Sequence, residues 1–119
     1  MSAVVREMYP ETQRVPPQSV PAEQSVLGGL MLSPSSLNLL GNALTEEDFY
    51  RADHRLIFRA IGELAEKNKP FDSVTLGAWF EANGLSGSVD SRYLNELAMN
   101  VHSAANIMAY AEIVRSKSV

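Results

Sequence analysis

Two adjacent glycines inside an apolar helical pattern most constrain how this chain can fold. Residues 21–31 read PAEQSVLGGLM and carry apolar side chains at the spacing of one helix face. Gly28 and Gly29 lie within that pattern, where each glycine costs about 1 kcal/mol of helix stability relative to alanine. The missing side chains leave room for a second backbone to come close. The pair therefore predicts close helix packing in this segment.

Helix signals continue through the rest of the chain. Caps or first-turn residues are expected at Pro21, Ser33-Pro34, Thr45, Asp53, Asp72, Asp90 and Ser103. Stop signals follow at Asn68 to Pro70 and at Asn83-Gly84. No segment alternates apolar and polar residues with a period of two, so little or no sheet is expected. The sequence predicts an all-α protein, a compact bundle of about six or seven short helices, with Trp79 and Phe80 as core anchors.

The chain divides into three expected segments. Residues 1–18 contain three prolines and little periodicity, and we interpret them as a flexible N-terminal arm. Residues 19–102 are predicted to form a helical head domain. Residues 103–119 begin a further helix that meets no stop signal, which suggests the first part of a longer protein. A natural end in a frayed helix is the alternative.

The composition excludes several kinds of function. The chain has 119 residues, a net charge of −4 and no cysteine, which excludes disulfide and thiolate chemistry. An acidic chain with ten Lys and Arg residues is poorly suited to hold phosphates by itself. No apolar run approaches the ~18 residues of a membrane span, and no secretory leader is visible. We therefore expect a cytoplasmic protein without a membrane partner.

The sequence offers little catalytic chemistry. It has no glycine-rich phosphate loop, and its two histidines, His54 and His102, lack the spacing of metal ligands. His54 is expected near a helix start, either solvated or hydrogen-bonded. The acidic run Glu46 to Asp48 is better explained by the helix dipole than by acid–base catalysis. No catalytic, metal-binding or cofactor-binding residue is predicted.

Two tyrosines allow more than one interpretation. Tyr93 lies one position away from the apolar stripe that begins at Leu94, so it is expected at the border of core and surface. It is either structural or an aromatic residue that contacts a partner. Tyr110 falls within its own helical stripe and is expected in packing or helix–helix contact.

Several motifs in one order resemble a known family. They are AEQSVLGGL at 22–30, DFY at 48–50 with His54 and Ile57-Phe58, DSVTL at 72–76, Tyr93-Leu94 with Leu97, and SAANI with Tyr110-Ala111 and Ile113-Val114 from 103 to 114. Together they resemble the N-terminal domain of the bacterial replicative DNA helicase, the DnaB family. The chain departs from the family pattern at Ser88 to Asp90, where paired glycines are common, and at His102, where proline is common.

The resemblance implies a non-catalytic assembly and primase-docking domain. The parent of this family is a hexameric ring that uses ATP and Mg²⁺ to unwind the replication fork 5′ to 3′. Its nucleotide and DNA sites lie in a C-terminal domain, so this chain needs no cofactor and meets DNA only through that domain. The N-terminal domains associate as a trimer of dimers and bind the C-terminal helicase-binding domain of primase. The last helix then looks like the first arm of a helical hairpin, cut short.

Seven residues are candidates for interactions. Tyr93 and Glu23 are predicted to bind a partner. The residues predicted for self-association or close helix packing are Gly28, Gly29, Ile107, Tyr110 and Val114. The alternative function is a module that contacts single-stranded DNA, or an adaptor without helicase activity.

Overall fold

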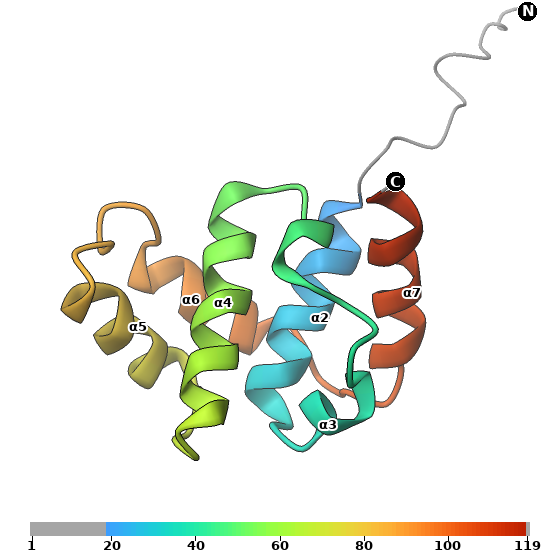
Figure 1. The fold of residues 1–119 in the computed structure, drawn as a ribbon, viewed down its shortest axis with the longest axis horizontal. Helices are drawn as coiled ribbons and strands as arrows, with labels where there is room; N and C mark the ends of the chain where they lie inside the picture. The colour runs from blue at the N-terminus through green and yellow to red at the C-terminus, as the bar shows by residue number, and fades with distance from the viewer. Residues whose placement is uncertain (1–18, 119) are drawn as a thin grey trace, which may run out of the picture.

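Helices form all of the regular structure in residues 19–118, the part of the chain that the computed structural model describes (Figure 1). Six α-helices and one 3₁₀ turn follow one another: α2 (Val20–Leu32), α3 (Ser36–Leu40), η1 (Glu46–Asp48), α4 (Ala52–Glu66), α5 (Ser73–Ala82), α6 (Ser91–Met99) and α7 (Ile107–Lys117). The predicted all-α fold is confirmed for these residues. The arm expected at 1–18 lies outside them.

Side-chain caps begin several of these helices where the sequence predicts them. The Asp72 carboxylate accepts hydrogen bonds from the backbone N–H groups of Val74 and Thr75, at 3.0 and 2.8 Å. Asp90 accepts from the N–H of Arg92 at 3.0 Å. Such caps satisfy N–H groups that have no partner within the helix, and each contributes about 1 kcal/mol. The expected starts of α5 and α6 are therefore confirmed.

One helix begins later than expected. Ser103 does not open α7, because its hydroxyl accepts from the N–H of Ala105 at 3.0 Å in a separate turn. A serine side chain that bonds its own neighbouring backbone competes with helix formation. The helix begins only at Ile107, after Asn106.

Residues in the left-handed conformation follow the ends of α4 and α5. Asn68 follows α4 with a φ of 57°, and Gly84 follows α5 with a φ of 71°. Both asparagine and glycine tolerate this conformation after a helix end. The predicted stops at Asn68 and at Asn83-Gly84 are thus confirmed.

Helix α2 occupies the centre of the fold. In Figure 1 it lies between α4 and α7, with α6 behind α4 and with α5 at the far edge. Its most extensive contacts are with α7 and α6. The core around it includes the fully buried side chains Leu27, Leu30, Phe49, Ile57 and Leu94. The first and the last described helices therefore pack side by side and antiparallel.

Helix α7 shares the core of the preceding helices. Ile107, Ala111 and Val114 are each at most 2% exposed and belong to the same hydrophobic cluster as Leu27. The segment expected to begin a hairpin is thus packed into the head domain. Its continuation into a hairpin stays a prediction.

Candidate functional site

The glycine pair of α2 lies where the central helix meets two neighbours. A Cβ atom on Gly28 would overlap the carbonyl oxygen of Leu97 on α6 and come within 2.5 Å of Val101. A Cβ on Gly29 would lie 3.2 Å from the terminal methyl of Ile107 on α7. The close packing predicted for the pair exists within one chain, with the tightest approach at Gly28. Self-association through these glycines stays a prediction.

Glu23 lies inside the domain, where only 1% of its surface is exposed. One carboxylate oxygen is 2.7 Å from Nδ1 of His54, and the other accepts the backbone N–H of Tyr50 at 2.7 Å. A buried carboxylate requires such partners, because its desolvation is otherwise costly. The partner-binding role expected for Glu23 is not supported, since its carboxylate is enclosed and already hydrogen-bonded.

The hydrogen bonds continue from Glu23 through His54 to Tyr93. Nε2 of the fully buried His54 lies 2.6 Å from the Tyr93 hydroxyl, which also accepts from the side-chain amide of Gln24 at 3.1 Å. The two rings are nearly parallel, with centroids 5.8 Å apart and 9° between their planes. These side chains come from α2, α4 and α6. We call them the Glu23–His54–Tyr93 network.

One arrangement of protons satisfies the whole network. The Glu23 carboxylate can only accept, so Nδ1 of His54 carries the proton that it donates. Nε2 is then an acceptor for the Tyr93 hydroxyl, and the hydroxyl oxygen accepts from Gln24. Each donor therefore faces an acceptor when His54 is neutral and Tyr93 is protonated.

The electrostatics of the site favour this arrangement. Burial lowers the pKa of His54 below its ordinary value, although the hydrogen bond to Glu23 opposes the shift. Burial also raises the pKa of Tyr93, against the hydrogen bond from Gln24. Both shifts keep these groups uncharged near neutral pH, which matches the proton positions that the hydrogen bonds require.

Tyr93 connects this interior to the surface. It is half-buried, as its place beside the apolar stripe predicts. The guanidinium of Arg51 lies 4.9 Å from the centre of its ring and pairs with Asp53 at 2.6 Å. The partly exposed residues Gln24, Arg51, Asp53 and Tyr93 are called here the Tyr93 patch. Beside it, a hollow of about 200 Å³ is lined by Gln24, Tyr93, Glu96 and Asn100, among others.

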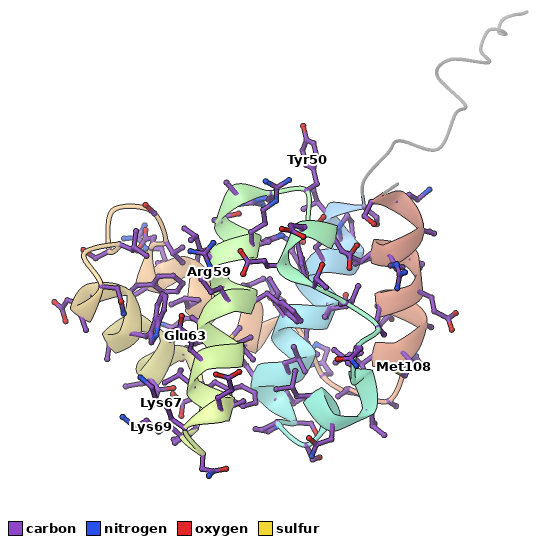
Figure 2. All side chains as sticks on the ribbon, viewed as in Figure 1. Tyr50, Arg59, Glu63, Lys67, Lys69 and Met108 are labelled. Carbon is purple, nitrogen blue, oxygen red and sulfur yellow. The ribbon has the colours of Figure 1, made fainter. Side chains whose placement is uncertain are left out.

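The residues predicted for self-association on α7 do not share one surface. Ile107 and Val114 face the core, whereas Tyr110 is half-buried. The exposed apolar side chains of this helix are instead Met108 and Ile113, at 38% and 39% exposure. Figure 2 shows Met108 at the end of α7 that lies near α3. Met108 and Ile113 are called here the α7 surface, although residues five apart on an α-helix point in directions about 140° apart and do not share one face.

The network was the main feature that the sequence analysis missed. The expected place of His54 near a helix start is confirmed, as is the hydrogen-bonded alternative, but its full burial and its bonds at both ring nitrogens to Glu23 and Tyr93 were not predicted. A signal for it exists in the sequence. Glu23 stands three and seven residues before Val26 and Leu30, so it belongs to the buried stripe of α2 and needs a polar partner inside.

The described part of the chain offers neither a metal site nor a membrane span. Among residues 19–118, no group of three or more His, Cys, Asp or Glu side chains is placed to hold a metal ion. The helices of this region are also too short or too polar to cross a membrane.

The fold places the chain in a structural class of replication proteins. Its helices superpose with a TM-score of 0.82 on the crystal structure of the N-terminal domain of DnaB helicase from Mycobacterium tuberculosis. The two are 39% identical, and the match covers 87% of this chain and 75% of the other. The class is therefore that of helical N-terminal domains of replicative helicases.

Sequence comparison identifies the family. Residues 15–116 match the family described as DnaB-like helicase N terminal domain, and the chain belongs to that family. It is 44% identical over 109 residues to the replicative DNA helicase DnaB of Geobacillus stearothermophilus, and 41% identical over 107 residues to the replicative DNA helicase DnaC of Bacillus subtilis. These matches cover 91% and 89% of this chain but 24% of each relative. The chain thus spans about a quarter of the length of these relatives.

Proposed function

We propose that this chain is the non-catalytic assembly and primase-docking domain of a hexameric replicative DNA helicase. In this proposal the parent protein unwinds the fork 5′ to 3′ in the cytoplasm. ATP, Mg²⁺ and DNA bind to its C-terminal domain, and the N-terminal domains associate as a trimer of dimers. The single observation that carries the proposal is the family match over residues 15–116.

The geometry around Tyr93 supports a docking role. Interfaces are enriched in tyrosine and arginine, because both offer a large contact area with a polar end. In the Tyr93 patch the guanidinium of Arg51 lies over the Tyr93 ring. The hydrogen bond from the Tyr93 hydroxyl to the buried His54 fixes the position of that ring. A side chain fixed in this way loses little entropy when a partner covers it. We therefore assign primase docking to the Tyr93 patch.

A titration with the C-terminal helicase-binding domain of primase from the same organism tests this proposal. Binding to the chain is measured by calorimetry, together with binding to two variants. Tyr93→Leu removes both the ring and the hydroxyl, so it should weaken binding about tenfold, equivalent to about 1.4 kcal/mol. Tyr93→Phe removes only the hydroxyl and serves as the matched control, because the aromatic contact surface remains. Because it also loses the hydrogen bond to His54 that fixes the ring, it should bind primase less tightly than the unchanged chain but more tightly than Tyr93→Leu.

Other results would contradict the proposal. Equal binding of primase by all three chains would remove the Tyr93 patch as the docking site. No binding of primase, combined with tight binding of a single-stranded oligonucleotide that falls steeply with salt, would favour the DNA-contacting alternative instead.

A further inference from the structure

Helix α5 is apolar around most of its circumference although it lies at the edge of the molecule (Figure 1). Over Ser73–Ala82 it carries one charged residue, Glu81. Leu76 and Phe80 face the core and are at most 1% exposed. A helix that is apolar on all sides is normally buried. The outer side of α5 is therefore more apolar than is usual for a helix face that no other element covers.

A second stripe of α5 lines a hollow against the end of α4. Its residues Thr75, Ala78, Trp79 and Ala82 recur at the spacing of one helix face. The hollow measures about 440 Å³, within the range of sites that hold small ligands or anchoring side chains. It exists because alanines occupy positions where larger residues would fill the space. We call it the α4–α5 groove.

The opposite wall of the groove comes from α4 and the loop after it. It is formed by Glu63, Leu64, Lys67, Lys69 and Pro70. Figure 2 shows Glu63, Lys67 and Lys69 near the end of α4 beside α5, far from Tyr50 and from Met108 on α7. The groove is therefore separate from the α7 surface.

The charges at the groove indicate the kind of occupant. Lys67 and Lys69 are both exposed, and the ion pairs within residues 19–118 include neither of them. Glu63 lies on the same wall and offsets one of these charges, so the wall carries a net charge of +1 on a chain whose net charge is −4. Trp79 is half-buried next to them and packs edge-on against Phe80 with ring centroids 5.1 Å apart. Tryptophan is enriched among the residues that contribute most to binding at protein interfaces.

We propose that the α4–α5 groove binds an acidic peptide segment of a partner protein. One bulky apolar side chain of that segment fills the hollow against Trp79, and its carboxylates lie against Lys67 and Lys69. The occupant is distinct from the partner at the Tyr93 patch, so the groove gives the domain a second docking site. Val74, at 77% exposure, stands one turn before Ala78 and extends the apolar surface for this segment.

The chain contains a reporter for this site, because Trp79 is its only tryptophan. A panel of short peptides, each with Asp and Glu residues around one Leu or Phe, is titrated while tryptophan emission is recorded. A matched panel carries Lys in place of the acidic residues. Saturable changes in emission are expected with acidic peptides and not with the basic panel.

Variants locate the binding. Lys67→Glu with Lys69→Glu should weaken binding of the acidic peptides at least about tenfold, because two attractive charges become repulsive. Arg92→Glu with Lys117→Glu makes the same change in net charge on α6 and α7, and it should leave the affinity unchanged. Ala78→Leu fills the hollow without altering charge and should also abolish binding. Circular dichroism checks that each variant is folded.

Three results would overturn the proposal. The first is the absence of a saturable response to any acidic peptide. The second is an equal loss of affinity in the two charge-reversed variants. The third is a change in tryptophan emission upon dilution of the chain without peptide, which would mean that a second copy of the chain occupies the groove.

Discussion

His54 is a polar side chain without exposed surface, and the domain tolerates it because both ring nitrogens have partners. A buried polar group that loses its partner costs about 1–3 kcal/mol, more than a satisfied hydrogen bond contributes. The network therefore makes three helices depend on one another. Removing the Tyr93 hydroxyl alone should therefore weaken the packing of all three helices.

The pH dependence of stability follows from the lowered pKa of His54. Unfolding returns this pKa to about 6.5, so the unfolded chain binds a proton more readily than the folded one. The free energy of unfolding should thus be highest above about pH 6.5 and fall as the pH drops below that value. Urea unfolding at a series of pH values measures this. A His102→Gln control should keep the dependence, and His54→Gln should lose it; an unchanged pH profile in His54→Gln would contradict the assignment.

Tyr93→Phe tests the network separately from docking. The change leaves Nε2 of His54 and the amide of Gln24 without their partner, so stability should fall by about 1–3 kcal/mol. The midpoint of urea unfolding reports the loss. Tyr110→Phe changes a half-buried tyrosine outside the network and should cost clearly less. Equal losses in the two variants would mean that the Tyr93 hydroxyl has no special role.

Among the helices, α2 and α6 have the least freedom to change their separation. Their backbones meet at Gly28, where no other side chain fits. Helix propensity alone favours alanine over glycine by about 1 kcal/mol. A Cβ atom at position 28 would however overlap the carbonyl oxygen of Leu97, and this overlap destabilises the fold. The carbonyl belongs to the backbone, so it cannot rotate away as a side chain could.

Alanine substitutions at three glycines should therefore separate packing from propensity. Gly28→Ala should destabilise the domain by about 1–3 kcal/mol, as overpacking does. Gly29→Ala meets only the flexible end of Ile107, so its effect should be small. Gly62→Ala, in the middle of α4 with open space around it, should stabilise by up to about 1 kcal/mol. Thermal unfolding ranks the three variants, and the same effect at all three glycines would contradict this account.

The helices were largely predictable from the sequence, because their signals are local. The caps at Asp72 and Asp90 bond groups two or three residues away, and periodicity placed Tyr93 at the border of the core. The network was not found, since its bonds join residues 31 and 39 positions apart. Phe80 is a core residue as expected, whereas Trp79 packs against the core but is only partly buried and also lines the groove. The spacing of apolar residues along α5 identifies the helix face that carries Trp79, but it does not tell whether another element covers that face.

For the molecule as a whole, Figure 2 shows Lys67 and Lys69 of the α4–α5 groove well separated from Met108 on α7. A partner in the groove therefore leaves Met108 accessible. If the chain assembles as proposed above, this separation lets it associate with copies of itself and bind another protein at the same time.

The isolated chain is expected to be a monomer or a weak dimer and not a hexamer. Its exposed apolar residues on α7, Met108 and Ile113, form only a small surface. Sedimentation equilibrium measures the state, and Met108→Glu with Ile113→Glu should abolish any dimer. Val74→Glu, on the exposed side of α5, is the control and should have no effect on dimerisation. A stable hexamer of the unchanged chain would overturn the prediction.

The contact between α2 and α7 also has a consequence for synthesis. The ribosome makes α2 before the other described helices, yet α2 packs most extensively on α7, the last of them. Helix α2 can therefore pack against α7 only after Val114 has left the exit tunnel of the ribosome. Until then a nascent chain leaves uncovered the face of α2 around Gly29 that meets α7, the kind of surface that chaperones cover. If the ribosome pauses before Val114, the domain stays incomplete, even when all of its earlier helices have already been synthesised.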